Sequence, residues 1–290
     1  MSNIGLSERK NYVGASEVAD LFGVGFKSRW QLWLEKKGRI EPEDLSANES
    51  VQAGKFLEPA IAAWAADKWQ MNLRKVKRYI AHPYIQGFGA SLDYESQEGV
   101  LVPTEIKWSQ SREGWTIEED TILDAPLRYL LQVQAQMACT GSNTGWLVAL
   151  VSGKLTRMLV ERHLETIERI ESEVVKFWLS IKEDREPKPD FSLDSATIAA
   201  LMQIDANKIV DMTDSNHLPV LCDEYLKAAD AESQAEKKKK ASMAEIRTLI
   251  GSASKVLANG FVITNTMVKE SAINYVRKPY PLTKITAKKL

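Results

Sequence analysis

Hydrophobic residues recur at helical spacing in the first part of the chain. In residues 15–22 (ASEVADLF), apolar side chains follow a small polar residue, Ser16, which predicts a short helix capped by that serine. A second helix is predicted over residues 29–38, where a glycine ends it. A third is predicted over residues 50–69, and Pro59 stands inside its pattern as a possible kink or restart.

The pattern then changes to short segments rich in β-branched and aromatic residues, bounded by glycine and proline. Helical spacing returns in residues 126–140, between a proline and Gly141, and again in the amphipathic segment 164–183. Residues 109–123 between strand and helix are expected to form a loop. Strands are predicted over residues 73–83, 87–95, 99–108, 145–153 and 155–163, the last two as a hairpin.

This order of elements predicts an α/β or α+β fold with a central mixed β-sheet flanked by helices. After Pro189 the composition shifts to a polar connector, a strongly charged helix over about 219–250, and a terminal hairpin within 259–277. The chain is therefore expected to consist of a core, residues 1–190, and a basic C-terminal extension, residues 191–290.

Composition narrows the class of protein. With 290 residues, 44% hydrophobic and 27% charged, the chain is typical of soluble globular proteins. It contains no apolar run long enough for a membrane span and no signal-peptide pattern, so we expect no membrane partner and a cytoplasmic location. Two cysteines and three histidines argue against a disulfide framework or a zinc site, so any metal is expected on oxygen ligands.

Charge is unevenly distributed along the chain. From Lys227 onward there are 13 lysines and arginines against 5 aspartates and glutamates, and the acidic excess lies before that point. A basic terminal region suits a polyanionic partner. A solvated helix explains the same charges, and for the four lysines Lys237–Lys240 it is the simpler interpretation.

Three charged residues stand out within the predicted strands, in GASLDYESQEGVLVPTEIKW, residues 89–108. Glu105 and Lys107 alternate along one strand and so face the same side, while Ile106 faces the other. If Asp93 lies close to Glu105, the two carboxylates and the Ile106 carbonyl offer a set of oxygen ligands of the kind that Mg²⁺ prefers. By itself the pattern is weak, because a half-exposed strand carries such charges without any function.

Five ordered motifs support the metal-site interpretation: RKNYVGASEVADLFG, GKFLEPAIAAW, GASLDYE, TEIKW and YLLQVQAQM. Through them the chain resembles the YqaJ-like viral recombinase and phage lambda exonuclease family of the PD-(D/E)xK nuclease superfamily. The resemblance extends from Arg9 to Phe177 and implies a restriction-endonuclease-like core. Leu92 departs from the family, which more often has proline before the aspartate, and residues beyond the resemblance are not explained by it.

The resemblance implies roles for individual residues. Asp93, Glu105 and Lys107 would be catalytic together with Glu58, and the metal would bind Asp93, Glu105, the Ile106 carbonyl and, through water, Glu58. The metal would be Mg²⁺, with Mn²⁺ expected to substitute. A pocket for the DNA 5′-phosphate would comprise Arg9, Ser16, Ser91 and Gln132, with Gln136 left open.

Tryptophans divide into two groups. Trp30, Trp33, Trp64, Trp69, Trp146 and Trp178 stand at predicted core positions. Trp108 and Trp115 flank the loop beside the expected site, so we expect them, with Arg112, to be candidate DNA contacts, one of them as a wedge at the duplex end.

The resemblance implies a Mg²⁺-dependent 5′-to-3′ exonuclease that acts on ends of linear double-stranded DNA and leaves 3′ single-stranded tails for recombination by strand annealing. It further implies a phage or prophage protein in a bacterial host, a ring-shaped homo-oligomer resembling a trimer, and a single-strand annealing protein as partner. Two alternatives stay open: a DNA-end-binding module without turnover, and an endonuclease of the same fold.

Overall fold

The computed structural model describes residues 8–97, 101–205 and 207–267. The chain forms two compact units, residues 1–197 and 198–290. The boundary expected from the sequence, after residue 190, lies slightly before the boundary between these units.

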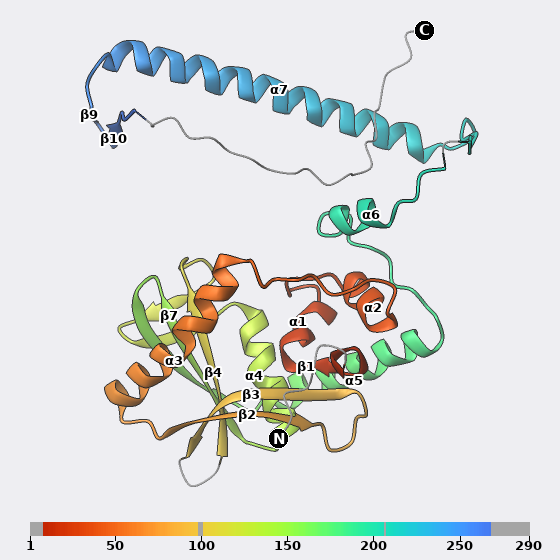
Figure 1. Cartoon of the computed structure of the whole chain (residues 1–290), viewed down its shortest axis with the longest axis vertical. Coiled ribbons are helices and arrows are strands. Elements are labelled where there is room, and N and C mark those ends of the chain that lie inside the picture. The colour runs from red at the N-terminus through yellow and green to blue at the C-terminus, as the bar shows by residue number, and fades with distance from the viewer. Residues whose placement is uncertain (1–7, 98–100, 206, 268–290) are drawn as a thin grey trace. The chain divides into compact units, whose positions relative to one another are not determined.

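A mixed eight-stranded sheet forms the centre of the first unit (Figure 1). Its strands are β1 (Val13–Gly14), β2 (Leu73–Ala81), β3 (Phe88–Gln97), β4 (Leu101–Ser109), β5 (Thr116–Glu118), β6 (Thr121–Asp124), β7 (Thr144–Val151) and β8 (Lys154–Glu161). They follow the order β1-β3-β4-β7-β8-β6-β5, and β2 also pairs with β3. Parallel pairs such as β4–β7 combine with antiparallel pairs such as β3–β4, which confirms the predicted mixed sheet.

Helices cover the sheet on both faces. They are α1 (Val18–Leu21), α2 (Arg29–Lys37), α3 (Glu49–Trp69), α4 (Leu127–Thr140) and α5 (Leu164–Lys182), preceded by the 3-10 turns η1 (Glu8–Asn11) and η2 (Ala15–Glu17). On one face α3 packs through Ile61 and Ala65 against Ile106 of β4. On the other, α4 lies between the sheet and α5 (Figure 1).

The close approach of α4 to the sheet depends on Gly145 in β7. A Cβ atom at this position would lie 2.5 Å from Cγ1 of Val133 on α4, which is far inside van der Waals contact. Any larger residue would therefore push the helix away. Because α4 also carries Gln132 and Gln136, this packing sets the distance of both side chains from β4.

Most predicted helix ends are confirmed. Gly38 and Gly141 end α2 and α4 with left-handed backbone, each at φ 74°. Pro59 lies inside an uninterrupted α3. The prediction for Ser16 is wrong, because Gly14 is the capping residue and its N–H donates to Glu17 Oε2 over 2.9 Å, while Ser16 lies within the following turn.

The segment expected to be a loop, residues 109–123, contains the short hairpin β5–β6. Each strand is only three or four residues long and carries few apolar side chains, so its periodicity is too brief to detect. β6 joins the main sheet through β8, which makes this hairpin part of the core sheet.

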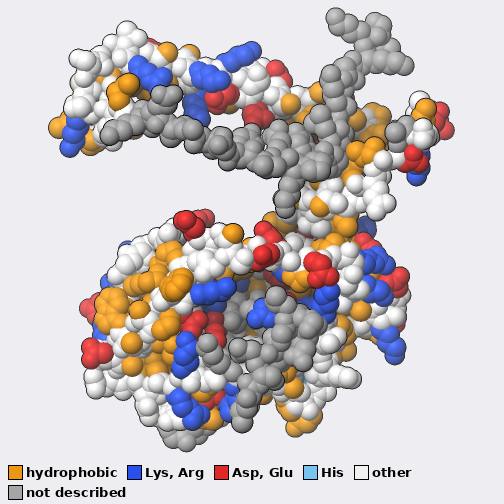
Figure 2. Space-filling model, viewed as in Figure 1, with side chains coloured by type: hydrophobic (Ala, Val, Ile, Leu, Met, Phe, Trp, Pro, Cys, Tyr) orange, Lys and Arg blue, Asp and Glu red, His pale blue; other side chains and the backbone are white. Residues whose placement is uncertain are grey.

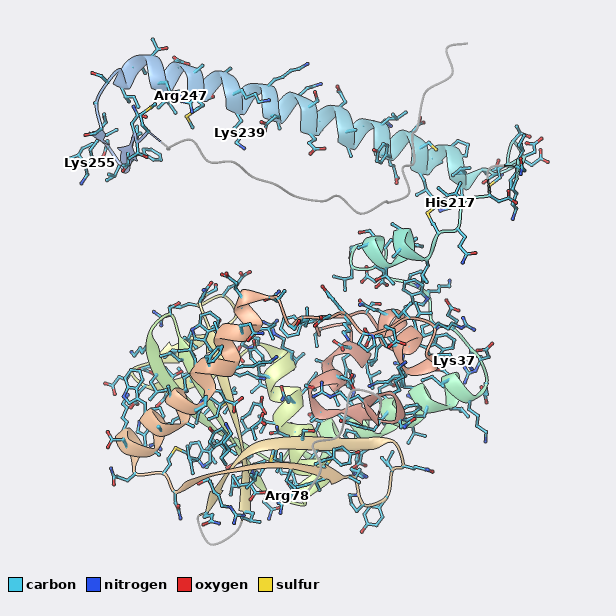
Figure 3. All side chains as sticks on the ribbon, in the orientation of Figure 1. Lys37, Arg78, His217, Lys239, Arg247 and Lys255 are labelled. Atoms are coloured by element: carbon cyan, nitrogen blue, oxygen red, sulfur yellow. The ribbon has the colours of Figure 1, made fainter. Side chains whose placement is uncertain are left out.

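The second unit contains one long helix and a hairpin. α6 (Ser195–Leu201) spans the boundary, and α7 (His217–Ile250) follows with no buried residue, as the predicted charged helix. Figure 3 shows Lys239 and Arg247 on α7. Lys239 and Lys240 pair with Glu236 of the same helix at 3.7 and 3.6 Å, as expected for a solvated helix. Their contact with DNA stays a prediction.

The terminal hairpin begins earlier than predicted. It comprises β9 (Lys255–Ala258) and β10 (Phe261–Thr264), so the Asn259–Gly260 pair forms the turn and does not precede the first strand. Such a pair is a strong hairpin signal, and the first strand was missed because it is only four residues long. The remainder of the predicted segment, from residue 268, lies outside the described residues.

Within the described ranges, none of the helices combines the length and the apolar character that crossing a membrane requires.

Candidate active site

Asp93 and Glu105 lie at the strand fork, the point where β3 and β4 separate. The last registered pair of these antiparallel strands joins Tyr94 to Thr104. One residue farther, the same register places Asp93 opposite Glu105, and alternation along both strands turns the two side chains to one face. The structure therefore brings together the two carboxylates that the sequence pairs in its expected metal site.

Both oxygens of the Glu105 carboxylate are held by protein groups. Lys107 Nζ lies 2.6 Å from Oε1, and Gln136 Nε2 donates to Oε2 over 2.6 Å. Burial alone would lower the pKa of Lys107, but the carboxylate of Glu105 holds that pKa above its ordinary value. Lys107 is therefore a fixed ammonium beside the carboxylate pair.

Asp93 faces a crowded group of negative charges. Burial raises the pKa of Asp93 to about 6, and the nearby carboxylates of Glu58 and Glu105 add to this shift. The side chain of Asp93 nevertheless keeps access to solvent. Glu58, on α3, is partly balanced by Lys75 Nζ at 3.5 Å. Figure 2 shows acidic and basic side chains intermixed on the face of the first unit that it views.

The donor chemistry fits a hard divalent cation. Asp93, Glu105 and Glu58 supply only oxygen ligands, and the carboxylates of Glu58 and Glu105 act electrostatically on Asp93. Among the described residues, no three acidic, histidine or cysteine side chains converge closely enough to form a ready metal cluster. Ile106 is buried in the core, 9% exposed, and its carbonyl as a ligand stays a prediction.

A cavity of about 860 Å³ opens beside Lys107. Its lining includes all four residues expected to hold a 5′-phosphate, Arg9, Ser16, Ser91 and Gln132. They come from η1, η2, β3 and α4, so only the folded chain brings them together. Lys107 lines the same cavity and connects it to the carboxylates.

Residues 6–143 match the model of the YqaJ-like viral recombinase domain. Over this segment the chain is similar to YqaJ-like viral recombinase domains. Every residue expected from the sequence to serve the site lies within the matched segment. This match supports a phage-type nuclease.

Solved structures of nucleases resemble the chain over about two thirds of its length. An alkaline exonuclease from Laribacter hongkongensis is 25% identical, with a TM-score of 0.47 over 67% of this chain and 98% of that one. A structure of that enzyme with dAMP has a TM-score of 0.48 at 24% identity, covering 67% and 96%. A phage-related exonuclease from Haemophilus somnus has a TM-score of 0.44 at 12% identity, covering 59% and 94%. No curated protein sequence matches the chain.

The three residues expected to contact DNA differ in their surroundings. Trp108 is half-buried and lines the cavity, and Arg112 is exposed but is not among the lining residues. Trp115 is only 8% exposed, and its ring lies against Tyr129 with 5.5 Å between centroids. This burial argues against Trp115 as a wedge between bases.

Gln136 is a positioning residue that the sequence left open. Its side chain is 1% exposed, and its Nε2 donates to the carboxylate of Glu105. Its i, i+4 spacing from Gln132 was a signal that both face the site. Spacing alone could not tell whether α4 approaches β4 closely enough for the amide to reach a carboxylate.

We expect Gln136→Ala to lower activity and metal affinity by ~10- to 100-fold, because Glu105 loses the donor that orients it. Gln134→Ala is a matched control, since this buried amide of the same helix bonds the backbone of Glu161 and His163, at 2.7 and 3.0 Å. Titration of DNA hydrolysis against metal concentration separates the two variants. Equal losses of metal affinity in both would contradict the assigned role.

Asp20, on α1, is a buried carboxylate that lines the same cavity. Its Oδ1 accepts the backbone N–H of Lys27 over 3.1 Å, and Gly25 allows the chain to pass beside it. Burial, opposed by the bond from Lys27 and reinforced by Glu17, raises the pKa of Asp20 to about 6. The folded protein therefore binds a proton here more tightly than the unfolded chain does.

Because the folded pKa exceeds the unfolded one, stability due to Asp20 is present at low pH and is lost as pH rises from about 4 to 6. Asp20→Asn keeps the acceptor but carries no charge. We expect Asp20→Asn to gain stability relative to the wild type as pH rises. The difference between their free energies of unfolding should be about 2–3 kcal/mol larger at pH 8 than at pH 4. Urea unfolding at both pH values measures this, and a difference independent of pH would refute it.

Proposed function

We propose that the chain is a Mg²⁺-dependent 5′-to-3′ exodeoxyribonuclease acting on ends of linear double-stranded DNA. The single observation that supports this most is the placement of Asp93 and Glu105 together at the strand fork, with Lys107 joining them to the cavity. The proposed products are 3′ single-stranded tails, which a single-strand annealing protein would use in phage recombination.

Asp93, Glu105 and the Ile106 carbonyl would hold the metal, with Glu58 acting through water. Mg²⁺, or Mn²⁺ in its place, would supply an acidified water and charge neutralisation at the phosphoryl group. The protein's own contribution is positional. Gln136 orients Glu105, and the Lys107 ammonium lies where it can neutralise charge that develops on the cleaved phosphate.

The polarity is proposed from the cavity. Arg9 can form two charge-assisted hydrogen bonds with a terminal phosphate, and Ser16, Ser91 and Gln132 add neutral donors around it. A strand that enters with its 5′-phosphate bound there would present its first phosphodiester to Lys107 and the carboxylates. An endonuclease has no use for such a terminal clamp, and a binding module gains nothing from carboxylates beside phosphates.

Assembly is a further part of the proposal. A ring of identical subunits, trimeric by family resemblance, would keep the enzyme on DNA by enclosing it. We propose a cytoplasmic role in a bacterial host for a phage or prophage product, with residues 191–290 as an extension that contacts DNA, another subunit or the annealing protein.

The deciding experiment uses linear duplex DNA labelled at either strand end, with a 5′-phosphate or a 5′-hydroxyl, incubated with protein and Mg²⁺ or EDTA. We expect loss of the 5′-labelled nucleotide first, faster hydrolysis with the 5′-phosphate, and none in EDTA. Covalently closed circular DNA is the control. Equal attack on circles would favour the endonuclease, and end binding without hydrolysis in Mg²⁺ would favour the binding module.

A further inference from the structure

Arg128, near the start of α4, lies between two aromatic rings at the edge of the 860 Å³ cavity. Its Cζ is 4.9 Å from the ring centroid of Phe26 and 4.8 Å from that of Tyr129. Tyr129 also lies beside Lys107, whose Nζ is 5.2 Å from the same centroid. Rings and cations therefore alternate along the cavity wall as far as the lysine of the carboxylate site.

Among the described residues, none neutralises the charge on Arg128. Two other cations of the cavity are paired, Lys27 with Glu35 at 2.6 Å and Lys107 with Glu105 at 2.6 Å. Arg128 forms no ion pair or hydrogen bond with any described residue, and its Nε is buried without a partner. A guanidinium that stacks through its faces keeps its in-plane N–H groups for an anion, and it matches the geometry of phosphate.

Phe26 presents an apolar surface at the same place. Its side chain is 78% exposed, in the segment between α1 and α2, although it lines the cavity with Arg128. An exposed ring beside an unpaired guanidinium suits a nucleotide, which offers both a base to stack and a phosphate to bind. Trp115, buried behind Tyr129, supports this wall from inside.

We propose that Phe26 and Arg128 form a binding site for one nucleotide of the strand that enters the cavity. Arg128 binds a phosphodiester of that strand, and Phe26 stacks on the base at the end of the duplex. Tyr129 fixes the guanidinium from the opposite side. This inference rests on the proposed function, because it takes the end of a DNA strand as the ligand of the cavity.

Binding is measured without hydrolysis, in EDTA, with a fluorescein-labelled duplex that carries a 5′-phosphate. We expect Arg128→Ala to weaken binding by ~10- to 100-fold, as for a charge-assisted contact, and to reduce the dependence of log affinity on log salt by about one. Arg128→Gln tests the same contact with a polar side chain of similar length. The matched control is Arg169→Ala on α5, an exposed arginine outside the cavity, and we expect its affinity to equal that of the wild type.

Stacking is tested with 2-aminopurine as the 5′-terminal base. We expect quenching of its fluorescence on binding to the wild type, retained quenching in Phe26→Trp, and loss of quenching in Phe26→Ala with affinity ~5-fold or more weaker. The high exposure of Phe26 means that its replacement leaves the fold intact, which thermal unfolding verifies.

Three results would overturn the inference. If Arg128→Ala and Arg128→Gln bind as tightly as Arg169→Ala, with unchanged salt dependence, the phosphate contact is absent. If Phe26→Ala quenches as the wild type does, the stacking contact is absent. In either case, hydrolysis by the wild type from 5′-phosphorylated ends would leave the proposed function standing. A wild type that neither binds nor hydrolyses DNA ends would remove both proposals.

Discussion

Asp93→Asn should eliminate DNA hydrolysis, with a loss on the order of 10³-fold or more, while the protein stays folded. Asparagine keeps the shape of the side chain but removes the negative charge opposite Glu105 at the strand fork. A divalent cation would then lose a charged ligand. We expect calorimetry to detect Mg²⁺ binding by the wild type and much weaker binding, or none, by the variant.

Stability separates this effect from misfolding. Because Asp93 is crowded by the carboxylates of Glu58 and Glu105, the neutral variant is expected to unfold, without metal, at a temperature no lower than the wild type. Asp67→Asn provides a matched control, since this exposed aspartate of α3 lies away from the fork. Wild-type hydrolysis by Asp93→Asn, or equal losses in both variants, would falsify the assigned site.

The sequence could predict those parts of the site that depend on local geometry. Alternation along β4 places Glu105 and Lys107 on one face whatever packs around the strand, so the motif itself carries that information. Strand pairing between β3 and β4 follows from their closeness in sequence. The pairing register then decides that Asp93 meets Glu105, and the structure supplies this register.

Contacts set by tertiary packing could not be predicted in the same way. Gln136 reaches Glu105 only because Gly145 allows α4 to lie close to the sheet. Trp64 was expected in the core from helical spacing, but its side chain is 48% exposed, so that prediction is wrong. Spacing identifies which face of a helix is apolar, but it does not reveal how much of that face the sheet covers. Only a short part of α3 is buried.

Aromatic residues show the same limit. Trp115 and Phe26 both belong to irregular or short elements, where no periodicity indicates burial. Trp115 was expected to contact DNA because it flanks the loop beside the site, yet the structure buries Trp115 and exposes Phe26 at the cavity. Position along the chain could not reveal this, because the Trp115 ring packs against Tyr129 of the following helix.

Lys36 connects stability to the proposed phosphate pocket. This lysine of α2 is buried, with 3% of its side chain exposed, and its Nζ lies 2.7 Å from Glu17 Oε2 and 2.8 Å from the carbonyl oxygen of Arg9. Burial lowers the pKa of Lys36 even though Glu17 opposes the shift. One ammonium thus ties α2 to both turns that carry Arg9 and Ser16.

We expect Lys36→Met to lower the free energy of unfolding by about 3 kcal/mol, because methionine fills the space but leaves Glu17 and the Arg9 carbonyl without their cation. Lys10→Met is the matched control. Lys10 pairs with Glu41 at 2.8 Å, but Glu41 is 80% exposed, so the expected cost is at most about 1 kcal/mol. Urea unfolding at neutral pH compares the two.

The same variant tests whether the turn holds the pocket in place. With Arg9 released from Lys36, the preference for a 5′-phosphate over a 5′-hydroxyl end should shrink, while hydrolysis of the 5′-hydroxyl substrate by folded protein changes little. The reason is that the carboxylates and Lys107 lie on β3 and β4, to which Lys36 makes no bond. Equal slowing on both substrates at full folding would show that Lys36 acts on the carboxylate site, and an unchanged preference would separate Arg9 from phosphate binding.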